Sequence, residues 1–134
     1  MIVKSYEERK IDITKQKIHL LYGENQGQIK DFIDIFFKKK FKDSIYQYDE
    51  IEILNDENII FDTIQTKSFF EDKKLVIINR VTDKFKNIIE LIKEKELSDI
   101  NIILISNILE KKSKLRNFFE KDKNLVCVAF YKDT

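Results

Sequence analysis

The apolar residues of this chain form two kinds of pattern, short continuous runs and longer stretches with helical spacing. The continuous runs predict strands that are buried on both faces, as in a parallel sheet covered by helices. They lie at residues 18–22, 75–78, 102–105 and 125–130, and a weaker alternation at 45–48 predicts a fifth strand. We therefore expect one mostly parallel five-stranded sheet.

Helical spacing occupies the intervals between these runs. The clearest case is a set of apolar residues that recur every three or four positions and so form one helix face. Its members are Ile29, Phe32, Ile33, Phe36, Phe37 and Phe41. Residues 58–67, 85–92 and 111–120 show the same period, and Ser5 followed three residues later by Glu8 predicts a short helix through about Ile13.

Strands that alternate with helices along one chain predict an α/β fold of three layers, with helices on both faces of the central sheet. The chain has 134 residues, of which 43% are hydrophobic, so it is long enough for one domain with a substantial core. We therefore treat residues 1–134 as a single domain.

Charge and composition exclude several classes of function. Lysine and arginine total 25 against 24 for aspartate and glutamate, so any DNA contact is local and indirect. The single Cys127 and the single His19 exclude an internal disulfide and a four-ligand zinc site, and core packing in strands explains both. No apolar run approaches the roughly 20 residues that span a bilayer. We expect a cytoplasmic protein without a membrane partner.

The turn that begins at Gly23 is the first candidate site, because ligands of α/β folds bind where the strands end. A phosphate-binding loop needs a second glycine followed directly by Lys and Ser or Thr. Here Gly27 is followed by Gln28 and Ile29. The third predicted strand ends in the sequence Ile-Asn-Arg at 78–80, without the acidic pair that would hold magnesium. We expect a degenerate phosphate loop, and no cofactor.

Phe69 and Phe70 stand side by side between polar residues at the end of a predicted helix. Adjacent residues cannot face the same side of a helix, so at least one ring is free to project into solvent. The pattern alone favours packing of both rings in the core. The alternative is a hydrophobic plug that enters a pocket on a partner protein.

Four cations at the start of the last predicted helix form a second unexplained feature. They are Lys111, Lys112, Lys114 and Arg116. Positive charge at this position opposes the helix macrodipole, which suggests a compensating partner such as DNA or another protein subunit. The alternative is that solvent, Glu110 and Glu120 screen the four charges.

With these residues in view, the chain resembles the N-terminal domain of the delta subunit of bacterial DNA polymerase III. The segment Leu-Leu-Tyr-Gly-Glu-Asn at 20–25 resembles the opening strand and degenerate phosphate loop of that family. Ser68-Phe69-Phe70, followed by the strand within 73–78, is similar to its Ser-Leu-Phe motif and the next strand. Residues 109–120 look like the alphaproteobacterial version of the family.

The resemblance implies an AAA+-like domain that binds the beta sliding clamp in DNA replication and helps to open it without hydrolysing ATP. It implies a clamp-binding segment made of Thr66, Lys67, Ser68, Phe69 and Phe70, in which the two phenylalanines enter a hydrophobic pocket of the clamp. Phe69 stands where the family usually has leucine, which bears on the affinity for the clamp.

The resemblance also implies the wider context of the domain. Family members continue into a lid domain and a collar domain that joins the other clamp-loader subunits, and both are absent from these 134 residues. It implies no catalytic site in this chain, which would be part of the DNA-directed DNA polymerase III holoenzyme. The alternative function is a small nucleotide- or flavin-binding α/β enzyme that uses the turn at Gly23.

Overall fold

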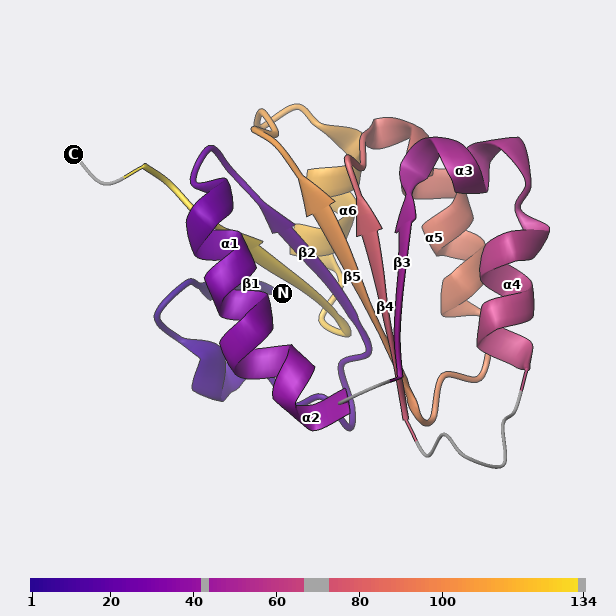
Figure 1. Cartoon of the computed structure of the whole chain (residues 1–134). Helices are drawn as coiled ribbons and strands as arrows, with labels where there is room; N and C mark the ends of the chain where they lie inside the picture. The colour runs from indigo at the N-terminus through magenta and orange to yellow at the C-terminus, as the bar shows by residue number, and fades with distance from the viewer. Residues whose placement is uncertain (42–43, 67–72, 133–134) are drawn as a thin grey trace.

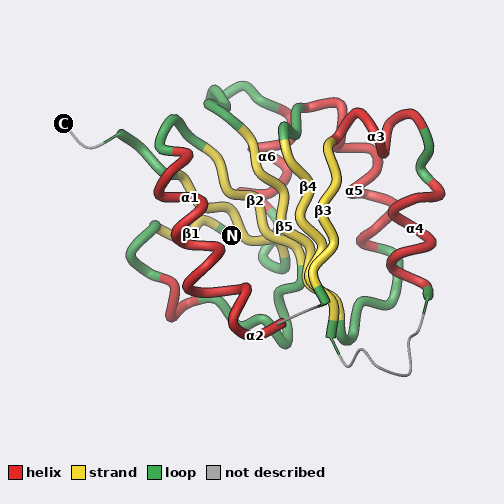
Figure 2. The backbone as a smooth tube through the Cα atoms, in the orientation of Figure 1, coloured by secondary structure: helices red, strands yellow, loops and turns green. Residues whose placement is uncertain are grey.

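The computed structural model describes residues 1–41, 44–66 and 73–132, and a parallel sheet of six strands lies at its centre (Figures 1 and 2). The strands are β1 (Ile2–Lys4), β2 (Ile18–Tyr22), β3 (Ile45–Asp49), β4 (Lys74–Asn79), β5 (Ile100–Ser106) and β6 (Leu125–Ala129). Their spatial order is β1-β6-β2-β5-β4-β3, and every neighbouring pair is parallel. The predicted α/β fold is confirmed, with six strands in place of five.

Helices cover both faces of the sheet, so the three-layer prediction is also confirmed (Figure 1). On one face, α1 (Gln26–Phe32) continues into a π-helix (Ile33–Lys38) and then α2 (Lys39–Phe41). On the other face lie α3 (Glu50–Asn55), α4 (Asn58–Gln65), α5 (Lys86–Lys93) and α6 (Lys114–Lys121). Short 3-10 turns occupy Glu8–Lys10 and Asp83–Phe85. No helix in the described ranges is long and apolar enough to cross a membrane.

Successive residues of each strand enter opposite cores, which explains the continuous apolar runs. Leu20 belongs to the core under α4, α5 and α6, whereas Leu21 belongs to the core under α1 and the π-helix. Both leucines are fully buried. At about 2 kcal/mol for each buried leucine side chain, strands of this kind contribute stability on both faces.

The π-helix between α1 and α2 keeps one set of apolar residues against the sheet. Ile29, Ile33, Phe37 and Phe41 are all buried and lie four positions apart. In a regular α-helix four residues turn through about 400°, so such a set drifts by about 40° at each step. The wider turns of a π-helix, with hydrogen bonds from i to i+5, counteract that drift.

The N-terminal segment differs from its sequence prediction. No helix runs from Ser5 to Ile13; β1 pairs with β6 instead, and only the short 3-10 turn follows. Glu7 closes the turn between β1 and this 3-10 turn, because its side-chain Oε1 accepts a hydrogen bond from the Lys4 amide at 3.0 Å. A strand of three residues is too short to show a period in the sequence, and its partner strand lies at the other end of the chain.

Candidate functional site

The turn after β2 is short and closed. β2 ends at Tyr22 and α1 begins at Gln26. Gly23 has a φ of +130°, and a Cβ at this position would lie 2.2 Å from the carbonyl oxygen of Phe130, so only glycine fits. The Gly23 amide donates to the Asn107 carbonyl at 3.1 Å, and the Asn25 amide donates to the Phe130 carbonyl at 3.2 Å. These amides therefore already have partners within the protein.

The side chains of Asn25 and Gln26 complete the turn from inside. Gln26 Nε2 donates to the carbonyls of Gly23 at 2.7 Å and Ser106 at 3.1 Å. Asn25 Oδ1 accepts from the Gln28 amide at 3.1 Å and so caps the first turn of α1. In a functional phosphate loop the backbone amides of this turn and of the first helical turn bind the phosphate oxygens. The internal bonds of this turn are consistent with the degenerate phosphate loop that the sequence predicts, and that loop stays a prediction.

The carboxyl end of β4 also departs from a nucleotide site. Asn79 ends the strand, and Arg80 follows with a φ of +56°, which is unusual for a residue with a side chain. Arg80 Nη2 donates to Asp49 Oδ2 at 2.8 Å, so this nearby carboxylate is engaged in an ion pair. Within the described part of the chain, no group of three or more His, Cys, Asp or Glu residues is arranged to hold a metal ion.

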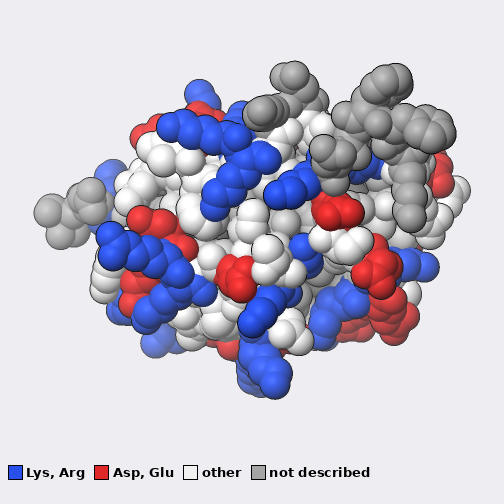
Figure 3. Space-filling view, turned by 90° about the horizontal axis from the view of Figure 1, so that it is seen from below, with Lys and Arg blue, Asp and Glu red and all other residues white. Residues whose placement is uncertain are grey.

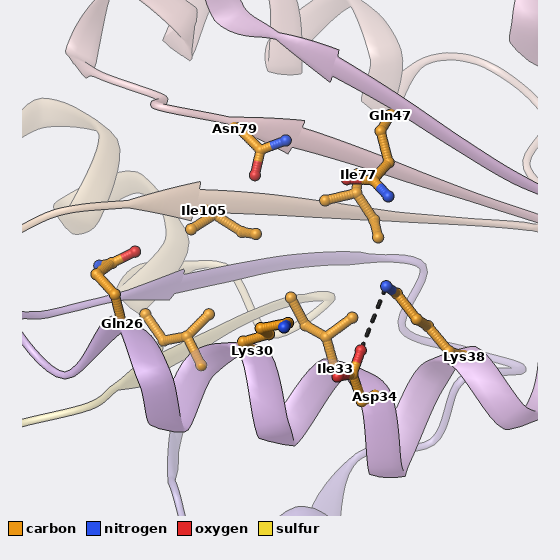
Figure 4. Close-up of a pocket in the computed structure, with 10 residues that line it drawn as sticks. Gln26, Lys30, Ile33, Asp34, Lys38, Gln47, Ile77, Asn79 and Ile105 are labelled. Carbon is orange, nitrogen blue, oxygen red and sulfur yellow. Dashed lines mark ion pairs between the residues drawn. The ribbon is translucent and has the colours of Figure 1, made fainter.

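A groove of about 370 Å³ lies between α1 with the π-helix and the ends of the neighbouring strands (Figure 4). Gln26, Lys30 and Ile33 line it from the helix side, and Gln47 and Asn79 face them from the strands. The Asp34 and Lys38 side chains form an ion pair at 3.3 Å along one wall (Figure 4). The lining therefore offers side-chain amides, aliphatic groups and the ammonium of Lys30, and the ion pair drawn in Figure 4 joins neighbouring helical turns.

The last helix begins later than predicted, and this changes the interpretation of the basic cluster. α6 starts at Lys114 with Ser113 as its N-cap, so Lys111 and Lys112 precede the helix. Asp83 supplies the missing negative charge at the N-terminus of α6. Its carboxylate accepts hydrogen bonds from Ser113 Oγ at 2.6 Å and from the Leu115 amide at 3.1 Å. Although burial opposes ionisation, these bonds lower the pKa of Asp83.

The cations of this cluster divide into two groups. Arg116 forms contacts within the protein. Its Nε donates to Glu120 Oε2 at 3.1 Å, and its Nη1 donates to the Leu109 carbonyl at 2.9 Å. Its guanidinium also lies 5.3 Å from the centre of the Tyr22 ring. Lys111, Lys112 and Lys114 are exposed, and Lys112 forms an exposed ion pair with Glu110 at 3.4 Å. Sequence reasoning anticipated Glu110 and Glu120 but missed Asp83, which lies far away in the sequence.

His19 and Cys127 are core residues, as their positions in strands predict. His19 is fully buried, its Nε2 lies 2.8 Å from Asn101 Oδ1, and its ring packs edge-on against Phe37. Burial lowers the pKa of His19 to about 4. Burial raises the pKa of the Cys127 thiol to about 12, so this thiol is unreactive at neutral pH.

Of the expected clamp-binding segment, the structure describes only Thr66; Lys67, Ser68, Phe69 and Phe70 lie outside the described residues. α4 runs antiparallel to the strands and ends at the same edge of the sheet at which β4 begins (Figure 1). Thr66 and Lys74 therefore lie at the amino edge of the sheet. The turn at Gly23 and the basic cluster lie at the opposite, carboxyl edge.

Lysine side chains are prominent at this amino edge. Figure 3 views the molecule from this side, where basic and acidic side chains are interspersed. A shallow groove of about 550 Å³ is lined here by Lys15, Lys17, Lys93 and Lys95, together with Glu96. Lys17 Nζ donates to the Ser98 carbonyl at 2.8 Å. The edge thus presents a surface of mixed charge where β2 and β6 begin and α5 ends.

The fold and the closed turn together define a class: a three-layer α/β domain with a six-stranded parallel sheet, in which the turn after β2 is bonded within the protein. A sequence profile of the family described as "DNA polymerase III, delta subunit" matches residues 19–129, so the chain belongs to this family. The match runs from β2 into β6 and includes all three segments on which the sequence resemblance rests.

A solved structure agrees with this assignment. The chain is similar to the Bacillus subtilis DNA clamp loader delta protein, with a TM-score of 0.64 and 14% sequence identity. The match covers 88% of this chain and 39% of that protein, so the present chain spans about two fifths of its relative's length. At this identity the similarity concerns the fold. No curated protein sequence matches the chain.

Proposed function

We propose that this chain is the clamp-binding domain of a clamp-loader delta subunit in DNA replication, and that it binds the beta sliding clamp without hydrolysing ATP. The observation that carries the proposal is the family match over residues 19–129, which includes the segment 66–70. In this proposal the domain has no catalytic site of its own and contributes to the DNA polymerase III holoenzyme by binding partners.

The proposed contact is a pair of aromatic side chains. Phe69 and Phe70 enter a hydrophobic pocket on the clamp, and Thr66, Lys67 and Ser68 complete the contact. Burial of two aromatic anchors at the centre of an interface is worth roughly 2 to 3 kcal/mol for each ring. The position of Thr66 at the amino edge supports this assignment, because that edge is remote from the closed turn at Gly23.

The test is the binding of the purified chain to the cognate clamp by surface plasmon resonance. Phe69→Ala combined with Phe70→Ala is expected to weaken binding by at least about 100-fold. Tyr6→Ala is the matched control, because it removes an aromatic ring that is 75% exposed elsewhere on the surface. Phe69→Leu restores the family's usual residue and should retain binding. Equal affinities for the wild type and the double variant would exclude the proposed contact.

The alternative function, a small nucleotide- or flavin-binding enzyme, depends on the turn at Gly23. Calorimetric titration with ATP, NAD and FMN distinguishes the two functions, since only the enzyme predicts saturable heat. The Gly23 and Asn25 amides favour the clamp-binding function, because they already donate to the carbonyls of Asn107 and Phe130 and would have to leave them to bind a phosphate.

We further propose that Lys111, Lys112 and Lys114 contact DNA or another clamp-loader subunit. Their exposure supports this role, whereas the hydrogen bonds of Arg116 indicate that it mainly supports the fold. A DNA contact predicts an affinity that falls steeply with added salt and falls further after charge reversal at these lysines. An affinity that does not change with either would exclude DNA as the partner.

A further inference from the structure

Lys74, the first residue of β4, is one of the few charged residues buried in the described structure. Its side chain is only 7% exposed. Its ammonium donates to the carbonyl of Thr63 at 3.0 Å and also to that of Thr66. A buried ammonium is costly unless it is well paired, so this arrangement requires a structural reason.

The two carbonyls belong to the C-terminal end of α4, where helical carbonyls lack partners within the helix. They also carry the negative end of the helix macrodipole, which favours a cation. The ammonium lies 5.8 Å from the centre of the Tyr46 ring, which adds a cation–π contact from the edge strand β3. Lys74 is therefore held by β3, by β4 and by the last turn of α4.

A second contact from β3 holds the same turn of α4. Thr63 Oγ1 donates to the Ile59 carbonyl at 2.8 Å, and the hydroxyl of Tyr48 donates to Thr63 Oγ1 at 2.8 Å. The main chain at Lys74 is fixed as well, because its amide donates to the Asp99 carbonyl at 2.9 Å. The end of α4 is thus attached to the sheet by two side-chain contacts, at Lys74 and at Tyr48.

Thr66 and Lys74 are the described residues nearest to either side of the segment 67–72, apart from the exposed Lys73. One ammonium therefore connects the end of α4 with the start of β4. We propose that Lys74 is a positioning residue for clamp binding, which fixes the two ends of the contact segment relative to each other. The inference rests on the proposed function of that segment. Because Thr66 and Lys74 then keep one relative position before and after association, we expect Lys74 to act on the association rate constant for the clamp.

Lys74→Met removes the ammonium and keeps an unbranched apolar side chain. Binding to the clamp is measured by surface plasmon resonance, at a temperature where circular dichroism shows each variant folded. We expect the association rate constant to fall about tenfold, while the dissociation rate constant changes by less than about twofold. Lys73→Met is the matched control: it removes the same charge from the exposed neighbouring side chain and should change neither rate constant by more than about twofold.

Two further variants keep the test decisive if Lys74→Met folds poorly. Lys74→Arg retains the charge and the donors, and should bring the association rate constant back to within about threefold of the wild type. Tyr48→Phe removes the second contact and should lower the association rate constant by about threefold, with unchanged dissociation. An unchanged association rate constant in Tyr48→Phe, together with one in any folded Lys74→Met, contradicts the proposal.

The remaining outcomes separate this inference from the function on which it rests. If Lys74→Met binds like the wild type while Phe69→Ala with Phe70→Ala abolishes binding, the positioning role is wrong and the clamp contact stands. If Lys74→Met mainly accelerates dissociation, Lys74 touches the clamp directly and is not a positioning residue. If the wild type itself does not bind the clamp, the proposed function fails first.

Discussion

At the scale of single residues, the buried polar side chains mark the places where elements far apart in the sequence meet. The side chain of Glu50 on α3 accepts hydrogen bonds from the amide and the hydroxyl of Thr82, at 2.6 and 2.8 Å. Ser106 Oγ donates to the Val81 carbonyl at 2.8 Å. Sequence patterns do not reveal such pairs, because each partner looks like an ordinary surface residue in its own segment.

His19 predicts a pH-dependent stability. Its pKa is lowered to about 4 in the folded chain against an ordinary value of 6.5, so the unfolded chain binds more protons between these values. Stability is therefore complete above about pH 6.5 and is lost as the pH falls toward 4. We expect a free energy of unfolding about 2 kcal/mol lower at pH 5 than at pH 7.5.

Urea denaturation at a series of pH values checks this expectation, with His19→Gln as the comparison. Glutamine does not titrate and has an amide that can bond to Asn101, so the free energy of unfolding of this variant should change much less between pH 7.5 and 5 than that of the wild type. A wild-type curve as flat as that of the variant would show that His19 does not carry the dependence.

At Gly23 we expect the addition of a single methyl group to lower the free energy of unfolding strongly. In Gly23→Ala the new Cβ would lie 2.2 Å from the Phe130 carbonyl oxygen, at a φ of +130° that L-residues rarely adopt. We expect a loss of at least about 2 kcal/mol in the free energy of unfolding. Gly27→Ala is the control, because the nearest atom to its added Cβ is 3.9 Å away and its position is helical. Equal losses in the two variants would contradict this account.

At the scale of elements, the sequence pattern identifies the strands and helices that carry large apolar faces. β2, β4, β5 and β6 appear as continuous apolar runs, and α5 as a clear helical period. The missed elements are those that bury little: β1 buries only Val3, and α3 buries only Glu50 and Ile53. The sequence did contain one signal of α3, which is Asp49 followed three residues later by Glu52, the spacing of a capping box. In the structure Glu52 Oε1 accepts a hydrogen bond from the Asp49 amide at 3.0 Å.

At the scale of elements, we predict how much the acidic cap at the N-terminus of α6 contributes to stability. Asp83 accepts hydrogen bonds from the Ser113 side chain and the Leu115 amide, so Asp83→Ala leaves that helix end without its acidic partner. We expect a loss of about 1 to 2 kcal/mol in the free energy of unfolding by urea denaturation. Asp31→Ala, which removes an exposed aspartate from α1, should change stability by less than about 0.5 kcal/mol. A loss in Asp83→Ala no larger than that of Asp31→Ala would exclude the cap.

At the scale of the whole molecule, the two candidate regions occupy opposite edges of one sheet. β4 runs from Lys74 to Asn79 and so separates the two edges of the sheet by about 17 Å, at a rise of about 3.3 Å for each residue. The sequence predicts each region separately, but only the topology shows their separation. The residues 67–70 of the clamp-binding prediction lie outside the described structure, so that part of the site remains a prediction.

This separation predicts independent effects of variants at the two edges. Reversal of charge in Lys112→Glu with Lys114→Glu should leave the affinity for the clamp within about twofold, because distant sites act additively. When Lys112→Glu and Lys114→Glu are combined with Lys74→Met, the affinity for the clamp should fall only as much as it does in Lys74→Met alone. A double-mutant cycle measured by surface plasmon resonance checks this, and a coupling beyond about 1 kcal/mol would contradict the independence of the edges.

The bonds of Gln26 across the turn after β2 have a consequence for regulation. The polar groups of this turn are already bonded within the protein, so we expect ATP and ADP not to stabilise the folded chain. The melting temperature should then be the same with and without millimolar ATP or ADP. Under the proposed function, this domain would then fix the position of its partner, and a separate nucleotide-hydrolysing protein would determine when that partner is released.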